Sequence, residues 1–246
     1  MPPVPEYQIY QEVKEYIKQY PTFSRLIQYD QPIKQRISGY EPRHKVYNSK
    51  SYNSDYYHPD SIRRTKTTIS DLILSNKFDL FCTFTFDPKK VDRYNPDTVK
   101  KVMSKWLNNQ RDLHGQLDYL IVPEFHKDGK AIHFHALIKN FKGKLKDTGK
   151  LRKQRPIYNI TSFRSGYSTA VPIDNIEKVS SYVKKYITKD MPLFSGKKRY
   201  WCSTNLIRPY TIPNPIIDNY NDYTQVYTLE NLTVSEHHPT IQAQLI

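Results

Sequence analysis

The chain predicts an α+β fold in which helices flank a central, largely antiparallel β-sheet. Between residues 78 and 208 the expected elements follow the order strand, helix, two or more strands, helix and strand. Tight turns join neighbouring strands in this region, which is typical of antiparallel pairing. Packing the helices on one face of such a sheet would bury the apolar side of each element.

The first strand and the first helix of this region have clear patterns. Residues 80–86 alternate phenylalanine with threonine, so one face of the strand is apolar and the other polar. A helix is expected from Asp97, a candidate N-cap, to Arg111. Its apolar stripe, which supplies part of the core, comprises Val99, Val102, Met103, Trp106 and Leu107.

A β-hairpin is expected next. Its strands are the apolar segments at residues 117–125 and 131–139. The connection contains Asp128 and Gly129, and Asp-Gly between two apolar runs is a strong turn signal. The two strands should therefore lie side by side, with their side chains in register across the pair.

Two histidines and a glutamate on this hairpin form a candidate metal site. His133 and His135 are two residues apart, so both side chains project from one face of the second strand, and the hairpin brings Glu124 beside them. Imidazole is a common ligand for divalent metals. His126 lies on the same strand face as Glu124 and is an alternative ligand. We prefer Glu124, because a charged oxygen suits Mg²⁺ or Mn²⁺ better than a third imidazole would.

The segment after the hairpin is strongly basic. Lysine and arginine dominate residues 142–146 and 150–155, and this stretch is expected to be mobile. Two further strands are expected at residues 156–163 and 167–172, with a turn at residues 164–166 between them.

A second helix is expected after Ile173, opened by Asp174 and Glu177 at the spacing of a capping box. Ile176, Val179, Val183 and Ile187 form its apolar stripe.

Two tyrosines on this helix are candidate nucleophiles. Tyr182 and Tyr186 are four residues apart and would lie one above the other. At about 100° per residue, Tyr182 lies at the rim of the stripe, close to Lys178 and Lys189, and Tyr186 lies nearer the core. Lys185 lies farther round the helix. The alternative interpretation is structural: two amphipathic tyrosines at the edge of a core, with lysines beside them.

The chain is expected to have three parts. Residues 1–60, rich in proline, tyrosine and glutamine, predict an N-terminal arm that is partly irregular, with a short helix at residues 12–20. Residues 61–209 carry the folded domain with the candidate site. Residues 210–246 predict a C-terminal extension or tail, in which residues 225–229 form one strand.

The charge of the chain favours a polyanionic partner. Lysine and arginine outnumber aspartate and glutamate by 38 to 24, which gives a formal net charge of +14 and a pI near 9.5. Nucleic acid is the commonest such partner. Arg63, Arg64 and Lys66 lie on the polar face of an expected helix at residues 61–74 and, with Lys178, are candidate DNA contacts. A solvated helix face is the alternative interpretation for the first three.

Other features narrow the cellular setting. No apolar run is long enough to span a bilayer, so no membrane partner is expected, and the first residues do not resemble a signal peptide. Cys82 and Cys202 lack the spacing of a zinc or redox motif and are expected to be buried free thiols. A reducing, cytoplasmic compartment is the expected location.

These candidate groups together suggest phosphodiester chemistry. A tyrosine hydroxyl has a pKa of about 10 and is a poor nucleophile at neutral pH. A divalent metal would polarise the scissile phosphate, and nearby lysines, with Lys185 and Lys189 as candidates, would lower the tyrosine pKa. The product would be a covalent phosphotyrosine and a free sugar hydroxyl. This reversible linkage suits nicking followed by rejoining.

Three ordered motifs resemble those of HUH endonucleases. Residues 81–87 resemble the first motif, residues 133–135 the His-hydrophobic-His metal motif, and residues 182–189 the catalytic tyrosine motif. Their order and spacing are similar to those of rolling-circle replication initiators of plasmids and small single-stranded DNA phages. Residues 199–206 also resemble a segment that often follows the third motif in that group. The resemblance covers residues 61–209.

The resemblance implies an RRM-like core, dependence on Mg²⁺ or Mn²⁺, and a 5′-phosphotyrosyl link to single-stranded DNA at a replication origin. The protein would then be a metal-dependent tyrosine endonuclease that also rejoins strands, and Glu124 would complete the metal triad. Tyr182 and Tyr186 each begin a Tyr-x-x-Lys, so both remain candidates, and the helical angle favours Tyr182. The chain has no Gly-x-x-x-x-Gly-Lys-Ser/Thr segment, so a host helicase is an expected partner. A phage-encoded protein would act in the host cytoplasm.

Two other functions fit parts of the pattern. A transposase or conjugative relaxase would use the same metal and tyrosine chemistry in a different biological process. A noncatalytic DNA-binding regulator of replication would bind an origin without cutting it, and replacing both histidines by alanine would not change that binding.

Overall fold

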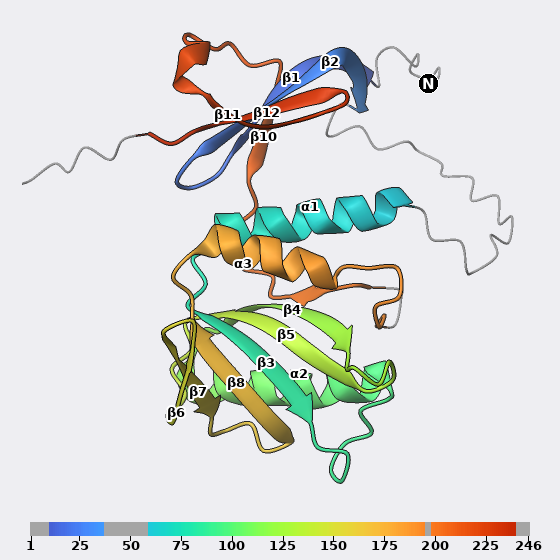
Figure 1. Cartoon of the computed structure of the whole chain (residues 1–246), viewed down its shortest axis with the longest axis vertical. Coiled ribbons are helices and arrows are strands. Elements are labelled where there is room, and N and C mark those ends of the chain that lie inside the picture. The colour runs from blue at the N-terminus through green and yellow to red at the C-terminus, as the bar shows by residue number, and fades with distance from the viewer. Residues whose placement is uncertain (1–9, 37–58, 195–197, 240–246) are drawn as a thin grey trace, which may run out of the picture. The chain divides into compact units, whose positions relative to one another are not determined.

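The computed structural model describes residues 10–36, 59–194 and 198–239. The chain forms two compact units, drawn in Figure 1. Residues 57–207 make one unit, and residues 1–56 together with 208–246 make the other. In the part of the chain that the structure describes, no helix is both long and apolar enough to cross a membrane.

The unit of residues 57–207 is built on one antiparallel sheet of seven strands. Its spatial order is β6-β7-β8-β3-β5-β4-β9. The strands are β3 (Leu80–Phe86), β4 (Asp118–Phe125), β5 (Ile132–Lys139), β6 (Leu145–Arg152), β7 (Arg155–Ile160), β8 (Gly166–Pro172) and β9 (Trp201–Cys202). The helices are α1 (Pro59–Ser75), α2 (Pro96–His114) and α3 (Ile176–Val183), and the 3₁₀ turn η2 (Lys184–Tyr186) follows α3 directly. The predicted α+β fold with a central antiparallel sheet is confirmed.

Helices cover both faces of this sheet, so the expectation that they share one face is wrong. On one face, α2 packs its stripe against Cys82, Phe84 and Phe86 of β3. On the other face, α1 and α3 pack against a second apolar cluster that includes Phe81 and Leu137 (Figure 1). The central strands are apolar on both sides over part of their length, and a single helical layer would leave one of these sides in water.

The helix starts differ from the predicted caps. Asn95, not Asp97, caps α2, because its side-chain oxygen accepts hydrogen bonds from the backbone N–H groups of Asp97 and Thr98 at 3.0 and 3.1 Å. Asn175 caps α3 in the same way and accepts from the N–H of Lys178 at 2.7 Å. Asp174 lies one residue earlier and forms an ion pair instead of a cap.

The basic stretch expected to be mobile is largely strand. Residues 145–152 form β6 and pair with β7 in an antiparallel hairpin. The side chains of β6 are mostly exposed, so the strand lacks the alternation of apolar residues that would predict it. Backbone pairing holds it, helped by the Thr148 hydroxyl, which donates to the Ile157 carbonyl at 2.6 Å.

The terminal unit is a second antiparallel sheet, with the order β10-β1-β2-β12-β11. Its strands are β1 (Tyr10–Gln19), β2 (Ser24–Arg36), β10 (Tyr210–Pro213), β11 (Thr224–Leu229) and β12 (Leu232–His237), with a 3₁₀ turn η3 (Tyr220–Asp222). The strand expected at residues 225–229 is confirmed by β11. A partly irregular N-terminal arm and a C-terminal extension or tail were predicted, and the described residues of these two segments pair with one another in this sheet.

The helix predicted at residues 12–20 is wrong, because this segment is strand β1. Val13, Ile17 and Tyr20 are buried, and their spacing of four and three residues fits a helical stripe. In the structure Val13 and Ile17 are buried residues of β1, Tyr20 follows directly after its end, and a shift of register between Val13 and Glu15 marks a bulge.

Candidate active site

The three predicted metal ligands come from two neighbouring strands of the seven-stranded sheet. Glu124 on β4 is the direct cross-strand partner of His133 on β5, and His135 follows two residues later on the same face. Thr83 on β3 lies opposite His135 on the other side. The hairpin register therefore gathers the three side chains without any contribution from a flexible loop.

The ligand atoms of these residues converge. Glu124 Oε2 lies 2.7 Å from His133 Nε2 and 2.6 Å from His135 Nε2, and the two Nε2 atoms are 3.1 Å apart. This group is a candidate divalent-metal triad. His126 does not belong to it, although its ring lies 5.9 Å from that of His133. Glu124, and not the alternative His126, thus completes the predicted cluster.

The surroundings of the triad fit a metal centre. The hydroxyl of Thr83 lies 3.3 Å from His135 Nδ1, at hydrogen-bonding distance. A proton on Nδ1 donated to this hydroxyl leaves the Nε2 lone pair facing the cluster, which is the usual arrangement for a ligating histidine. Two imidazole nitrogens and one carboxylate oxygen form a donor set that binds divalent ions such as Mn²⁺.

The electrostatics also keep the triad in a ligating state. Burial alone would raise the pKa of Glu124, but hydrogen bonds and charge interactions with His135 and His133 outweigh it and lower that pKa. Burial, together with the neighbouring His135, lowers the pKa of His133. At neutral pH the carboxylate is therefore ionised and the His133 imidazole neutral, as metal ligation requires.

Both predicted tyrosines lie beside the triad. Tyr186 on η2 stacks its ring on His135, with centroids 4.0 Å apart and planes 13° apart. Tyr182 on α3 meets Tyr186 edge to face at 5.2 Å and Phe81 at 5.5 Å. The α-helix ends at Val183, so the angle predicted for Tyr186 from a continuous α-helix does not apply.

The two hydroxyl groups differ in their environments. Arg152 Nη2 donates to the Tyr182 hydroxyl at 3.2 Å. Burial would raise the pKa of Tyr182, but the hydrogen bond with Tyr186 and the Arg152 guanidinium outweigh it and lower that pKa. Burial and the hydrogen bond with Tyr182 raise the pKa of Tyr186. Tyr182 is thus the hydroxyl that loses its proton more easily.

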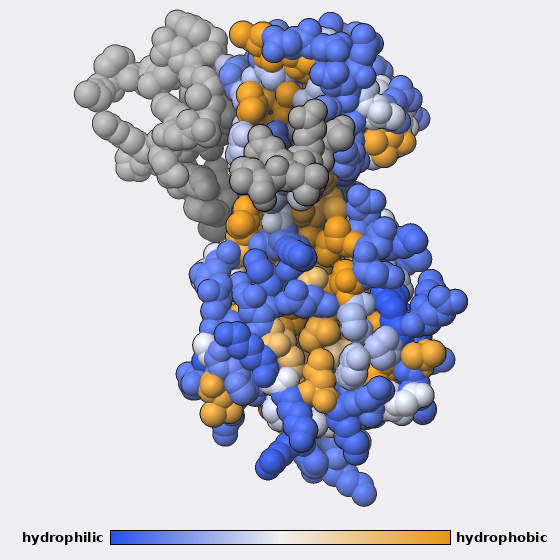
Figure 2. All heavy atoms as spheres, turned by 90° about the vertical axis from the view of Figure 1, so that its left-hand side faces the viewer, coloured by the Kyte–Doolittle hydropathy of each residue, from blue (hydrophilic) through white to orange (hydrophobic). Residues whose placement is uncertain are grey.

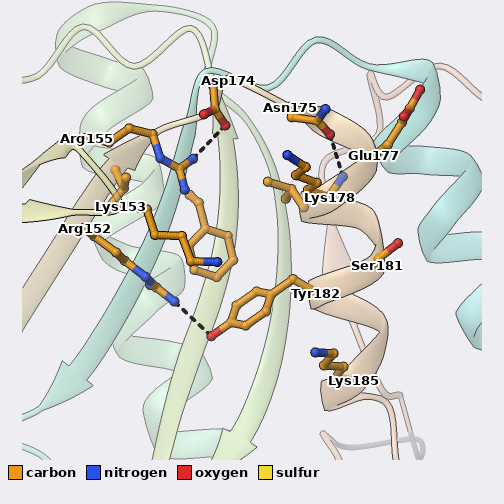
Figure 3. A pocket seen from close by; sticks show the side chains of 13 residues that line it. Arg152, Lys153, Arg155, Asp174, Asn175, Glu177, Lys178, Ser181, Tyr182 and Lys185 are labelled. Carbon is orange, nitrogen blue, oxygen red and sulfur yellow. Dashed lines mark hydrogen bonds and ion pairs between the residues drawn. The ribbon is translucent and has the colours of Figure 1, made fainter.

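A groove of about 700 Å³ opens beside Tyr182, between the β6–β7 hairpin and α3. Figure 3 shows Arg152, Lys153 and Arg155 on the hairpin side and Lys178 and Lys185 on the helix side. Tyr182 lies between the two sets, joined to the hairpin by its bond with Arg152. In Figure 2 the visible face of this unit is largely hydrophilic, with apolar side chains along its middle.

The structure places the remaining predicted site residues less closely. Lys185 and Lys178 both line the groove with Tyr182. Lys178 lies about one helical turn before Tyr182 along the chain. Lys189 is exposed in the segment after η2, and Arg63 and Arg64 are exposed on α1, where Lys66 is half-buried. None of these four lines the groove.

Sequence reasoning missed the hairpin cations Arg152, Lys153 and Arg155. The density of positive charge at residues 150–155 was the available signal. Because no apolar pattern revealed a strand there, nothing in the sequence placed this charge beside the tyrosines.

Part of the chain is similar to a known protein family. Residues 79–191 match the family model described as Replication-associated protein ORF2/G2P. This segment contains the triad, both tyrosines and the groove, and the match supports a role in DNA replication. No curated protein and no solved structure matches the chain.

Proposed function

We propose that this protein initiates rolling-circle DNA replication by nicking and rejoining single-stranded DNA at an origin. The observation that carries the proposal is the convergence of Glu124, His133 and His135 beside Tyr182 and Tyr186, inside the segment similar to replication-associated proteins. A metal triad next to paired tyrosines has the parts needed for metal-assisted attack on a phosphodiester.

The residues divide the reaction between them. Glu124, His133 and His135 would hold Mg²⁺ or Mn²⁺. When bound, the metal ion would neutralise negative charge on a non-bridging oxygen of the scissile phosphate. The Tyr182 oxygen attacks phosphorus, a Tyr182–phosphorus bond forms, and the bond from phosphorus to the 3′ oxygen breaks. The phenolic proton is transferred, in the net reaction, to that 3′ oxygen. The products are a 5′-phosphotyrosine and a free 3′ hydroxyl.

Tyr182 is the better candidate for the first attack. Its hydroxyl receives a hydrogen bond from Arg152, which stabilises the phenolate as the proton leaves. Tyr186 packs its ring flat on His135 and thereby fixes the orientation of a metal ligand. The hydroxyl of Tyr186 is hydrogen-bonded to that of Tyr182. It could attack a second phosphodiester while the first DNA strand is covalently held on Tyr182.

The phosphotyrosine bond retains the energy of the cleaved linkage, so attack by a 3′ hydroxyl restores the DNA strand. This reversibility suits replication that begins and ends at one origin. Single-stranded origin DNA is the proposed substrate, and a host helicase is the proposed source of unwinding.

A cleavage assay tests the proposal. Labelled single-stranded oligonucleotides that tile the encoding replicon are incubated with Mn²⁺, Mg²⁺ or EDTA. We expect cleavage at one site, dependent on metal and abolished in Glu124→Gln and His135→Ala. His126→Ala, which alters a nearby histidine outside the triad, serves as the control and should cut normally.

The alternatives give different results in this assay. DNA binding without cleavage of any strand segment would contradict the proposal and support a noncatalytic regulator. Cleavage at transposon ends or at a transfer origin, and not at a replication origin, would instead support a transposase or relaxase.

A further inference from the structure

The tip of the β6–β7 hairpin concentrates positive charge at one end of the groove. Arg152 and Arg155 face each other across the two strands, and Lys153 lies in the two-residue turn between them. Like charges directly opposite one another destabilise a strand pair. Asp174 pairs with Arg155 at 2.9 Å, but the other two cations have no carboxylate partner among the described residues.

The backbone of this turn is also unfavourable for its residues. Lys153 and Gln154 both have positive φ, at 49° and 65°. A two-residue hairpin turn of this kind strongly prefers Asn-Gly, because side chains beyond Cβ are strained in the left-handed region. The hairpin after β4 has a glycine, Gly129, at its positive φ, so the fold uses the relaxed solution elsewhere.

The helix side of the groove adds further positive charge. Lys178 and Lys185 line it from α3, together with Lys153 from the turn. The side-chain ammonium groups of these three lysines have no hydrogen-bond or ion-pair partner within the described ranges of the chain. Against the five cations of the lining stand two carboxylates, those of Asp174 and Glu177, and one of them is already paired with Arg155.

The positive charge of the whole chain is located in this unit. Residues 57–207 contain 29 lysines and arginines against 14 aspartates and glutamates, whereas the rest of the chain contains 9 against 10. A polyanion would therefore be attracted to this unit, and the groove is the place where five of its cations lie around Tyr182.

We infer that this groove binds the sugar-phosphate backbone of single-stranded DNA next to the linkage that Tyr182 attacks, and that the β6–β7 turn clamps one of its phosphates. The inference rests on the proposed function and specifies its DNA site. Local strain and opposed charges at the turn are tolerated because bound phosphate compensates for them. The site reads backbone charge and carries no information on base sequence.

Replacing the turn separates its effect on stability from its effect on binding. The double variant Lys153→Asn with Gln154→Gly installs the preferred turn and removes one cation. Gln154→Gly alone relaxes the backbone and keeps the charge. Lys101→Gln removes an exposed cation from α2, on the opposite face of the sheet, and controls for loss of charge in general.

The readout is fluorescence anisotropy of a labelled single-stranded oligonucleotide in EDTA, over a range of salt concentrations, with the Tm of each protein. Loss of one phosphate contact lowers the slope of log affinity against log salt concentration (the salt slope) by about 0.7, which corresponds to about fivefold weaker binding at about 0.1 M salt. We expect this loss in the double variant, together with an unchanged or higher Tm. Gln154→Gly and Lys101→Gln should bind like the unmodified protein.

A double variant that is as stable as the unmodified protein but keeps its affinity and salt slope would overturn the inference. An equal loss in Lys101→Gln would overturn it too, since the effect would then be one of total charge. Failure of the proposed function looks different: the unmodified protein would bind DNA without cutting it, and the groove variants would still differ in binding.

Discussion

The hydrogen bond between Thr83 and His135 leads to a specific prediction about the metal site. Thr83 supplies this bond from β3, and His133 Nδ1, in contrast, is buried without a partner in the described chain. Thr83 is therefore a side chain outside the triad that orients one of its imidazoles, that of His135, through a hydrogen bond. Thr83→Val removes the hydroxyl and preserves the shape of the side chain.

The expected cost follows from the geometry of this contact. Loss of an outer hydrogen bond to a metal ligand typically lowers affinity by about 10–100-fold. The distance of 3.3 Å is at the long end for a hydrogen bond, so we expect about tenfold, or about 1.4 kcal/mol. Titration calorimetry with Mn²⁺ measures this loss directly.

Two matched variants make the prediction sharp. Thr83→Ser keeps the hydroxyl and should bind Mn²⁺ almost normally. Thr85→Val changes a threonine on the same face of β3 and should have no effect on affinity. Equal affinity in Thr83→Val and the unmodified protein, with both folded, would refute the orienting role of this bond.

Three further predictions concern the nucleophile, pH and the sheet. Arg152→Gln should raise the pKa of Tyr182 and move the pH-rate profile of cleavage, at saturating DNA, to higher pH; an unmoved profile would refute this role. The pKa values of His133 and Glu124 are lowered in the fold, so on acidification the unfolded chain takes up protons before the folded chain does. The free energy of unfolding should therefore fall in acid, beginning below about pH 6.5 for His133 and below about pH 4.5 for Glu124. Urea unfolding across this range checks the sign, since greater stability in acid would contradict it. Gly166→Ala should cost about 1–3 kcal/mol in the same assay, because a Cβ there overlaps the backbone of β3; unchanged stability would mean that β8 can shift freely.

The candidate metal site was predictable because strand periodicity is a simple rule. Residues two apart on β5 share a face, and the Asp-Gly turn specifies which residues of β4 lie opposite. The pairing of Glu124 with His133 follows directly from that hairpin. The choice between Glu124 and His126, in contrast, needed coordinates, because both residues lie on the same face of one extended segment.

The groove was not predictable, because the strand that builds it has no apolar pattern. β6 is an edge strand with mostly exposed side chains, and its long-range pairing decides its structure.

In the terminal sheet an apolar pattern is present, but it fits two kinds of secondary structure. The buried residues of β1 have a spacing that fits a helix equally well, and only pairing with distant β10 and adjacent β2 makes the segment a strand.

The two tyrosines show a similar division. Their proximity to one another was predictable from a spacing of four residues. Their different roles depend on contacts from other elements: His135 of β5 holds the ring of Tyr186, and Arg152 of β6 holds the hydroxyl of Tyr182. Neither contact could be inferred without the fold.

The most direct test of the account is a search for the covalent protein–DNA adduct. Single-stranded DNA labelled on the 3′ side of the cleavage site is incubated with protein and Mn²⁺ and separated on a denaturing gel. We predict a labelled band that resists denaturation, is absent in EDTA, persists in Tyr186→Phe and is lost in Tyr182→Phe, with the nucleotide found on Tyr182 by mass spectrometry. Cleavage without any covalent band would contradict the account, because it would show that water, and not a tyrosine, attacks the phosphate.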